Sequence, residues 1–98
     1  MRTLLTALTA LMLLATPVVA GDMEDARTAY FAGDYQKAFR ISKRLAEQEN
    51  ARAQFWLGMA YDDGEGVPED DAKAVHWYRQ AAKQGYALAQ FNLGLIYG

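Results

Sequence analysis

Residues 53–61 read AQFWLGMAY, and residues 89–97, which lie 36 positions later, read AQFNLGLIY. Matches at one fixed period indicate stacked copies of one supersecondary unit. The sequence therefore predicts two units and the first half of a third, with bounds 22–50, 51–86 and 87–98. The same shift pairs five residues of an earlier segment with later ones: Asp34 with Asp70, Lys37 with Lys73, Ala38 with Ala74, Ala46 with Ala82 and Gln48 with Gln84.

Each unit is predicted to contain two helices joined by a turn. In the second unit, Leu57 and Tyr61 recur at the spacing of one helix face, and Ala74 and Tyr78 do the same further along. Between these segments, Pro68 keeps the residue before it out of the helical region, so the chain must turn there. These features predict an all-α fold, namely an α/α solenoid of helix-turn-helix repeats.

Several residues are predicted to end helices or to bring them close together. Asp34 and Asp70 can accept hydrogen bonds from the free N–H groups of a first helical turn. Gly85 stands where a left-handed C-terminal cap is favoured. Gly58 and Gly94 lie inside helices, where glycine costs about 1 kcal/mol relative to alanine. Their recurrence indicates that a neighbouring helix crosses at both positions too closely for a Cβ atom.

The composition excludes several classes of function. The 98 residues carry a formal net charge of -2 with acidic and basic residues mixed, so no basic surface for nucleic acid is predicted. There are no cysteines, which excludes a disulfide framework, a thiol nucleophile and a cysteine-based zinc site. We therefore expect no nucleic-acid partner and no cofactor.

The first twenty residues have the layout of a secretory signal peptide. A short positive start is followed by a hydrophobic run from Leu4 to Ala15, a helix break at Pro17, and small residues up to Ala20. The alternative is a membrane anchor, but the run is shorter than the roughly 20 residues that span a bilayer. We expect cleavage after Ala20, no stable membrane insertion afterwards, and a periplasmic or secreted protein.

The second unit resembles a known repeat, the Sel-one-like repeat, which is a long-loop relative of the tetratricopeptide repeat. The first unit departs from this pattern, since Arg27 stands where the helix glycine would fall. The third unit begins in the same way and then stops. The residues that carry the resemblance are Leu57-Gly58-x-x-Tyr61, Gly64-x-Gly66-Val67-Pro68-x-Asp70 and Lys73-Ala74-x-x-Trp77-Tyr78-x-x-Ala81-Ala82-x-x-Gly85.

The resemblance implies an adaptor or scaffold that binds a protein or peptide. In such solenoids the first helices of successive units line a concave surface that holds the partner. The alternative for each candidate residue is a place in the hydrophobic core. Carried over to this sequence, the partner-binding residues are Arg52, Phe55, Met59 and Asp62 in the second unit and Leu88, Phe91 and Leu95 in the third.

We predict no catalytic site and no metal site, so the chain is not expected to be an enzyme. Ser42 and His76 are the only serine and histidine, and catalysis would require them to meet beside an orienting acid. The acidic loop that begins at Asp62 lacks the ligand spacing of a calcium-binding loop. The alternative function is β-lactam hydrolysis or envelope remodelling, which the resemblance links to a cysteine-rich branch that this chain does not match.

The last predicted helix, residues 87–97, is apolar almost all round, and no charged residue follows Lys83. A helix of this kind is normally buried, and solenoids need polar caps at their ends. We expect either an amino-terminal fragment of a longer repeat protein or a real end covered by a partner or by a second copy in a homodimer.

Overall fold

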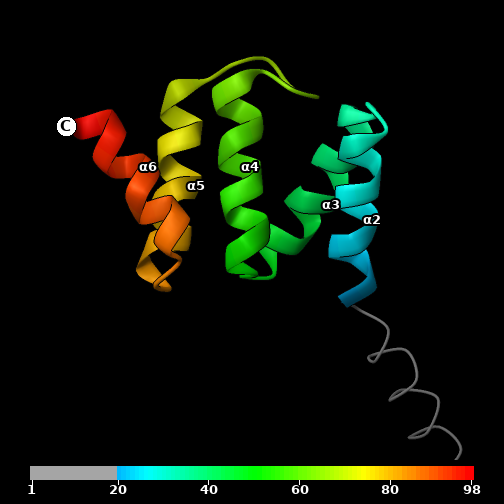
Figure 1. The fold of residues 1–98 in the computed structure, drawn as a ribbon, viewed down its shortest axis with the longest axis horizontal. Helices are drawn as coiled ribbons and strands as arrows, with labels where there is room; N and C mark the ends of the chain where they lie inside the picture. The colour runs from blue at the N-terminus through cyan, green and yellow to red at the C-terminus, as the bar shows by residue number, and fades with distance from the viewer. Residues whose placement is uncertain (1–19) are drawn as a thin grey trace, which may run out of the picture.

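The computed structural model describes residues 20–98, and this range folds into five α-helices without any strand (Figure 1). The predicted all-α repeat fold is therefore confirmed. The predicted signal peptide falls almost wholly outside the described residues and stays a prediction. None of the described helices is both long and apolar enough to cross a membrane. The helices are α2 (Ala20–Phe31), α3 (Tyr35–Glu47), α4 (Ala51–Asp63), α5 (Asp71–Lys83) and α6 (Ala87–Tyr97).

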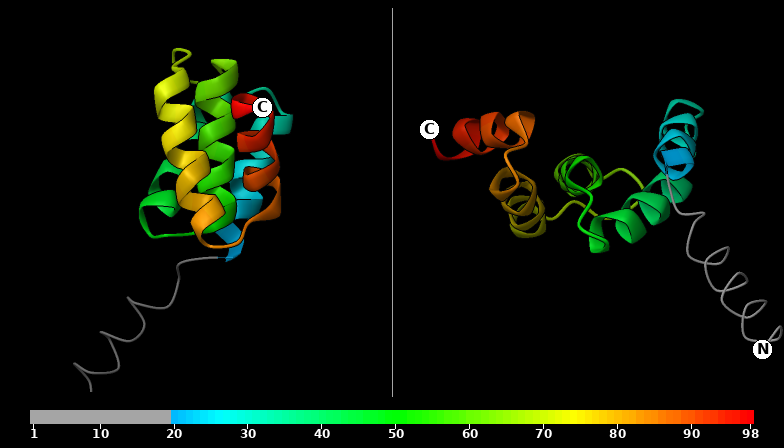
Figure 2. Two further views of the ribbon diagram at one scale, coloured as in Figure 1. Left: turned by 90° about the vertical axis from the view of Figure 1, so that its left-hand side faces the viewer. Right: turned by 90° about the horizontal axis from the view of Figure 1, so that it is seen from below.

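The helices are stacked in chain order, so that each packs mainly against its neighbours in sequence. Seen from below, they trace an arc, with α2, α4 and α6 on its inner side and α3 and α5 on its outer side (Figure 2, right). The first helices of successive units therefore share one side of the molecule, as the resemblance implied.

Side-chain caps begin three of the helices. Asp34 Oδ1 accepts a hydrogen bond from Lys37 N at 3.2 Å, and Asp70 Oδ1 accepts one from Lys73 N at 3.1 Å. Both predicted caps are thus confirmed. Asn50 caps α4 in the same way, with its Oδ1 accepting from Ala53 N at 2.9 Å. These bonds satisfy N–H groups that have no partner inside the helix.

The turns after α3 and α5 have the same backbone shape but different residues. Gly85 has a φ of 88°, which confirms the predicted left-handed turn after α5. The equivalent position after α3 holds Glu49, with a φ of 67°. A side chain with a Cβ atom is disfavoured in this conformation, whereas glycine adopts it freely. The first unit therefore carries strain that the second unit avoids.

The core lies between the helix layers and is built from small residues around a few large ones. Leu57 on α4 and Tyr78 on α5 are the largest side chains that are fully buried. The other fully or almost fully buried positions are mostly alanines, which allow the helices to approach closely. They include Ala26, Ala53, Ala74, Ala81 and Ala89.

The two helix glycines differ in their surroundings. A Cβ atom at Gly58 would lie 2.6 Å from the Cδ1 and Cε1 atoms of Tyr78, so the predicted close crossing is confirmed there. At Gly94 no neighbouring atom lies within 4 Å of the Cβ position, so the same prediction is wrong for Gly94 in the described structure. The reason is that no described helix follows α6 in the way that α5 follows α4.

Candidate partner-binding surface

The inner side of the arc is formed by α2, α4 and α6 (Figure 2). Arg52 and Met59 lie seven residues apart on α4, which places them on one face of that helix. Leu88 and Leu95 occupy the same positions on α6. Arg52 and Met59 are half-buried, whereas the side chains of Leu88 and Leu95 are 54% and 69% exposed. The exposed apolar part of this candidate surface therefore belongs to α6.

Phe55 does not belong to that surface. Its side chain is only 6% exposed, and its ring lies 5.8 Å from that of Tyr78 and 5.3 Å from that of Tyr86. The prediction of a partner-binding role for Phe55 is wrong, and the core alternative is correct. The physical reason is that α5 and the turn after it cover this face of α4.

Asp62 lies at the other end of α4, where it is half-buried. Its Oδ2 accepts a hydrogen bond from the Tyr78 hydroxyl at 3.3 Å. Burial, with a smaller contribution from the Asp62 carboxylate, raises the pKa of Tyr78 to about 12. Asp62 therefore already has a hydrogen-bond partner within the fold, namely the hydroxyl of the buried Tyr78 ring.

An aromatic and arginine cluster on α2 and α4 was not predicted from the sequence. The rings of Tyr30 and Trp56 lie 5.5 Å apart in a T-shaped arrangement and join the two inner helices. The Arg52 guanidinium lies 6.0 Å from the Trp56 ring centroid, and Arg27 lies 5.9 Å from that of Phe31, which is 73% exposed. The sequence signal for the Arg27–Phe31 and Arg52–Trp56 pairs was an arginine followed four residues later by an aromatic residue.

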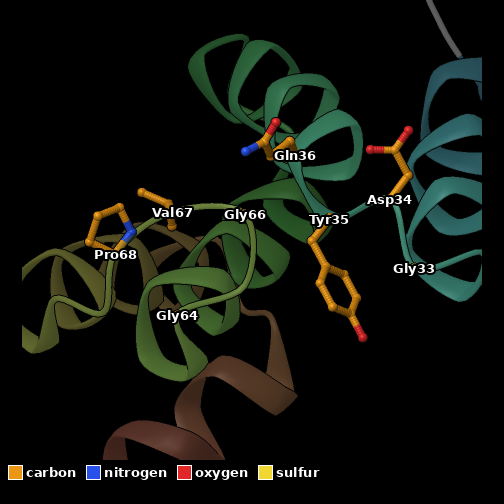
Figure 3. Close-up of a pocket in the computed structure, with 8 residues that line it drawn as sticks. All are labelled: Gly33, Asp34, Tyr35, Gln36, Gly64, Gly66, Val67 and Pro68. Carbon is orange, nitrogen blue, oxygen red and sulfur yellow. The ribbon is translucent and has the colours of Figure 1, made fainter.

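A hollow lies between the turn before α3 and the loop before α5. Its lining residues are Gly33, Asp34, Tyr35, Gln36, Gly64, Gly66, Val67 and Pro68 (Figure 3). Gly66 approaches the backbone carbonyl of Tyr35 so closely that no Cβ atom could be accommodated. The long loop of the second unit is therefore packed against the start of α3, and this contact explains why glycine stands there.

Ser42 and His76 lie on different outer helices, α3 and α5. The Ser42 side chain is buried, whereas that of His76 is exposed. The His76 and Trp77 rings form a T-shaped pair with their centroids 4.9 Å apart. No hydrogen bond joins Ser42 to His76 within residues 20–98. Over the same residues, no group of three or more His, Asp or Glu side chains is arranged to hold a metal ion.

The repeat pattern and the helix arrangement agree with one family of sequences. The Sel1 repeat profile matches residues 27–50, 51–86 and 87–98. The chain belongs to the Sel1 repeat family. The resemblance inferred from the loop and helix motifs is thereby confirmed at the level of the repeat.

A solved Sel1 repeat protein from Oxalobacter formigenes has the same arrangement of helices. It superposes with a TM-score of 0.67 at 30% sequence identity, over 90% of this chain and 40% of that protein. The two proteins are thus similar in sequence and share the fold of the repeat.

Curated relatives with similar repeats are much longer than this chain. An F-box protein of Arabidopsis thaliana is 35% identical over 74 residues, which are 74% of this chain and 20% of the relative. An ERAD-associated E3 ubiquitin-protein ligase component of the same plant, HRD3A, is 35% identical over 63 residues, or 64% of this chain and 9% of the relative. Chitin synthase regulator SKT5 of Malassezia restricta is 34% identical over 62 residues, which are 63% of this chain and 4% of the relative. The chain therefore spans about a fifth or less of these relatives.

Proposed function

We propose that this protein is an exported, non-catalytic adaptor that holds a protein or peptide partner on the inner side of its arc. The observation that carries the proposal is the pair of exposed leucines, Leu88 and Leu95, on the same face of α6. Exposed apolar side chains gathered on one face are typical of a surface that another protein covers. Arg52 lies on the equivalent face of α4 and adds a cationic group with an aromatic beside it.

The relatives support this kind of role. HRD3A is by name a component of a ubiquitin ligase, and SKT5 is by name a regulator of chitin synthase. Both names describe proteins that act on or with another protein. Since helical repeats share a scaffold and differ in their surfaces, the partner of this chain depends on its own inner residues.

Binding experiments with charge variants test the proposal. The purified chain would be titrated against candidate proteins of the cell envelope, together with variants Arg52→Glu and Leu95→Glu on the inner side. We expect saturable binding that weakens at least tenfold in both variants, because a buried unpaired charge is costly. Ala72→Glu on the outer helix α5 adds the same charge as Leu95→Glu at an exposed position and serves as the control. Binding that is equally strong in all three variants would refute the proposal that the partner binds on the inner side.

Export is a separate part of the proposal and has its own test. The layout of residues 1–20 supports cleavage after Ala20. N-terminal sequencing of the native protein should then begin at Gly21. A sequence that begins at Met1, in a protein recovered from the cytoplasm, would contradict export without affecting the binding proposal.

A further inference from the structure

Positive and negative charges are mixed along the sequence, but the fold separates them between the two sides of the arc. The outer helices α3 and α5 carry seven lysines and arginines but only two aspartates and glutamates. The inner helices α2, α4 and α6 carry two and five, respectively. The fold thus forms a basic surface that the net charge did not predict. We call it the basic outer surface, and its residues are Lys37, Arg40, Lys43, Arg44, Lys73, Arg79 and Lys83.

On both outer helices these basic residues occupy the exposed face. The buried residues of α3, such as Ala38, and its basic residues, such as Arg40, recur three or four positions apart on opposite sides of the helix. On α5, Tyr78 belongs to the buried face, and Arg79 and Lys83 lie on the exposed one. The buried faces of α3 and α5 pack against the inner helices. The exposed basic faces of both helices therefore lie on the same outer side of the arc (Figure 2, right).

Few of these positive charges are neutralised within the described fold. A single ion pair within residues 20–98 joins Arg44 Nη2 to Asp22 Oδ2 at 3.0 Å. Arg79 Nη2 donates to the neutral Tyr97 hydroxyl at 3.0 Å. Like charges gathered on one surface repel one another, and an external polyanion relieves this repulsion. The basic residues of the outer helices that have neither of these partners and no described carboxylate within ion-pair distance are Lys37, Arg40, Lys43, Lys73 and Lys83.

The basic outer surface also lacks large exposed apolar side chains among the described residues. Such side chains lie on α2 and α6 and at Tyr35, whose ring centroid is 5.2 Å from that of Tyr30 on α2. Tyr97 of α6 reaches only the edge of the surface, where it meets Arg79. An interface between two proteins has an apolar centre inside a polar rim, and this surface has no such centre. It is suited instead to a partner that presents many anionic groups side by side.

From these observations we infer that the basic outer surface binds the anionic headgroups of a phospholipid membrane. Each lysine or arginine held near an anionic bilayer strengthens binding about fivefold, so the unpaired cations of α3 and α5 act together. The surface lies on the headgroups without inserting, because it offers no apolar anchor. The inner side of the arc then faces away from the bilayer and stays open to the partner of the proposed function.

The choice of a membrane over a nucleic acid, which is also an extended polyanion, rests on the export part of the proposed function. The layout of residues 1–20 predicts that the chain leaves the cytoplasm, and this places it beside a membrane surface. The basic outer surface itself is a property of the described fold and does not depend on export.

Sedimentation with lipid vesicles tests the inference. The purified chain would be mixed with vesicles of phosphatidylcholine alone, and with vesicles of equal parts phosphatidylcholine and phosphatidylglycerol. Where the hydrophobic run from Leu4 to Ala15 is retained, it binds both kinds of vesicle, so the readout is the difference between them. We expect at least about tenfold tighter binding to the anionic vesicles at low salt. This difference should vanish near 1 M salt, where the Debye length is about 3 Å. Equal binding to both kinds of vesicle at low salt would overturn the inference.

Matched charge reversals locate the site. Arg40→Glu on the outer side and Arg52→Glu on the inner side change the net charge of the chain by the same amount. We expect Arg40→Glu to weaken binding to the anionic vesicles at least about tenfold, and Arg52→Glu to leave it unchanged. The Arg40 side chain is exposed and has no described carboxylate partner, so its reversal should not disturb the fold, which circular dichroism checks. Equal effects of the two variants would show that net charge and not the outer side governs binding, and would overturn the inference.

Two other polyanions separate the membrane from its alternatives. Duplex DNA and poly-glutamate would be offered at the same concentration of anionic groups as the vesicles. Tighter binding to DNA would assign the surface to a nucleic acid, and tighter binding to poly-glutamate would assign it to an acidic protein. Either result would overturn the inference. The inner surface of the proposed function is tested separately, by the effect of Arg52→Glu on binding to a protein partner.

Discussion

The ring of Tyr78 occupies the space in which a side chain of residue 58 would lie. The Cδ1 and Cε1 atoms are both 2.6 Å from the position of a Cβ atom on Gly58, and the Tyr78 side chain is fully buried. Because the ring is enclosed on all sides, it cannot move to admit even one methyl group. This contact allows α5 to pack against α4 at Gly58 more closely than a side chain there would permit.

Gly58→Ala should therefore destabilise the protein by about 1–3 kcal/mol, the usual cost of overpacking a core. Gly94→Ala is the matched control at the equivalent position of the next unit, where the same methyl group meets no described atom. It should be neutral or stabilise the fold by up to about 1 kcal/mol through helix propensity. Urea unfolding followed by circular dichroism measures both changes, and equal effects of the two variants would contradict the contact.

Tyr78→Phe should change how stability depends on pH. The pKa of Tyr78 rises from its ordinary value of 10.0 to about 12 in the fold, chiefly through burial. The folded state thus keeps the phenol proton at a pH where the unfolded state has released it, so folding stability falls as the pH rises from 10 to 12. This loss amounts to about 2–3 kcal/mol, since one pKa unit corresponds to about 1.4 kcal/mol.

The phenylalanine variant lacks this titration and should lose correspondingly less stability over the same pH range. At pH 7 it should be less stable than the wild type by about 1 kcal/mol, because the hydrogen bond to Asp62 is lost. Denaturant unfolding at pH 7, 10 and 11.5 compares the two proteins. Parallel stability profiles for both would show that Tyr78 does not contribute to the alkaline loss.

Glu49→Gly should stabilise the fold by about 0.5–1 kcal/mol. The φ of 67° at Glu49 costs a residue with a side chain about 1–2 kcal/mol, and the greater chain entropy of unfolded glycine offsets part of the gain. The backbone carbonyl of residue 49, which accepts a bond from Gln84, is retained. Gly85→Ala at the equivalent turn should instead destabilise the fold, because it places a Cβ atom at a φ of 88°. Thermal unfolding of the two variants checks both directions.

Gln54→Ala should destabilise the fold by about 1 kcal/mol, because it removes the buried bond to Ala46 O and the bond from Gln84 Nε2. Both groups keep a second partner, since Ala46 O accepts from Glu49 N and Gln84 Nε2 donates to Glu49 O. Gln90→Ala at the equivalent position of α6 removes one exposed bond and should cost less than about 0.5 kcal/mol. Chemical unfolding of the two variants compares these costs. A similar cost at both positions would show that the buried amide network adds no stability.

The repeat itself could be predicted from the sequence because each of its signals is local. The matches between residues 53–61 and residues 89–97 identify the unit, and helical spacing within each segment identifies its apolar face. Caps are equally local, since the Asp34 and Asp70 carboxylates bond to N–H groups only three residues away. Recognition of the family followed from the same short-range pattern.

The candidate surface could be predicted only in part. Phe55 and Phe91 occupy the same position of the repeat, in the segments AQFWLG and AQFNLG, yet one is buried and the other exposed. Helical periodicity shows that both residues lie on an apolar face, but it does not show whether a neighbouring helix covers that face. The pair formed by Tyr30 and Trp56 likewise joins residues far apart in the chain.

By itself, the sequence determined the helices, their turns and the order in which they stack, because those depend on interactions between residues a few positions apart. Only the tertiary structure decided which of two identical apolar positions is core and which is surface. Burial depends on the helix that arrives from elsewhere, as Tyr78 does at Gly58 and as no described residue does at Gly94. The same sequence pattern is therefore a packed contact in one unit and an open face in the next.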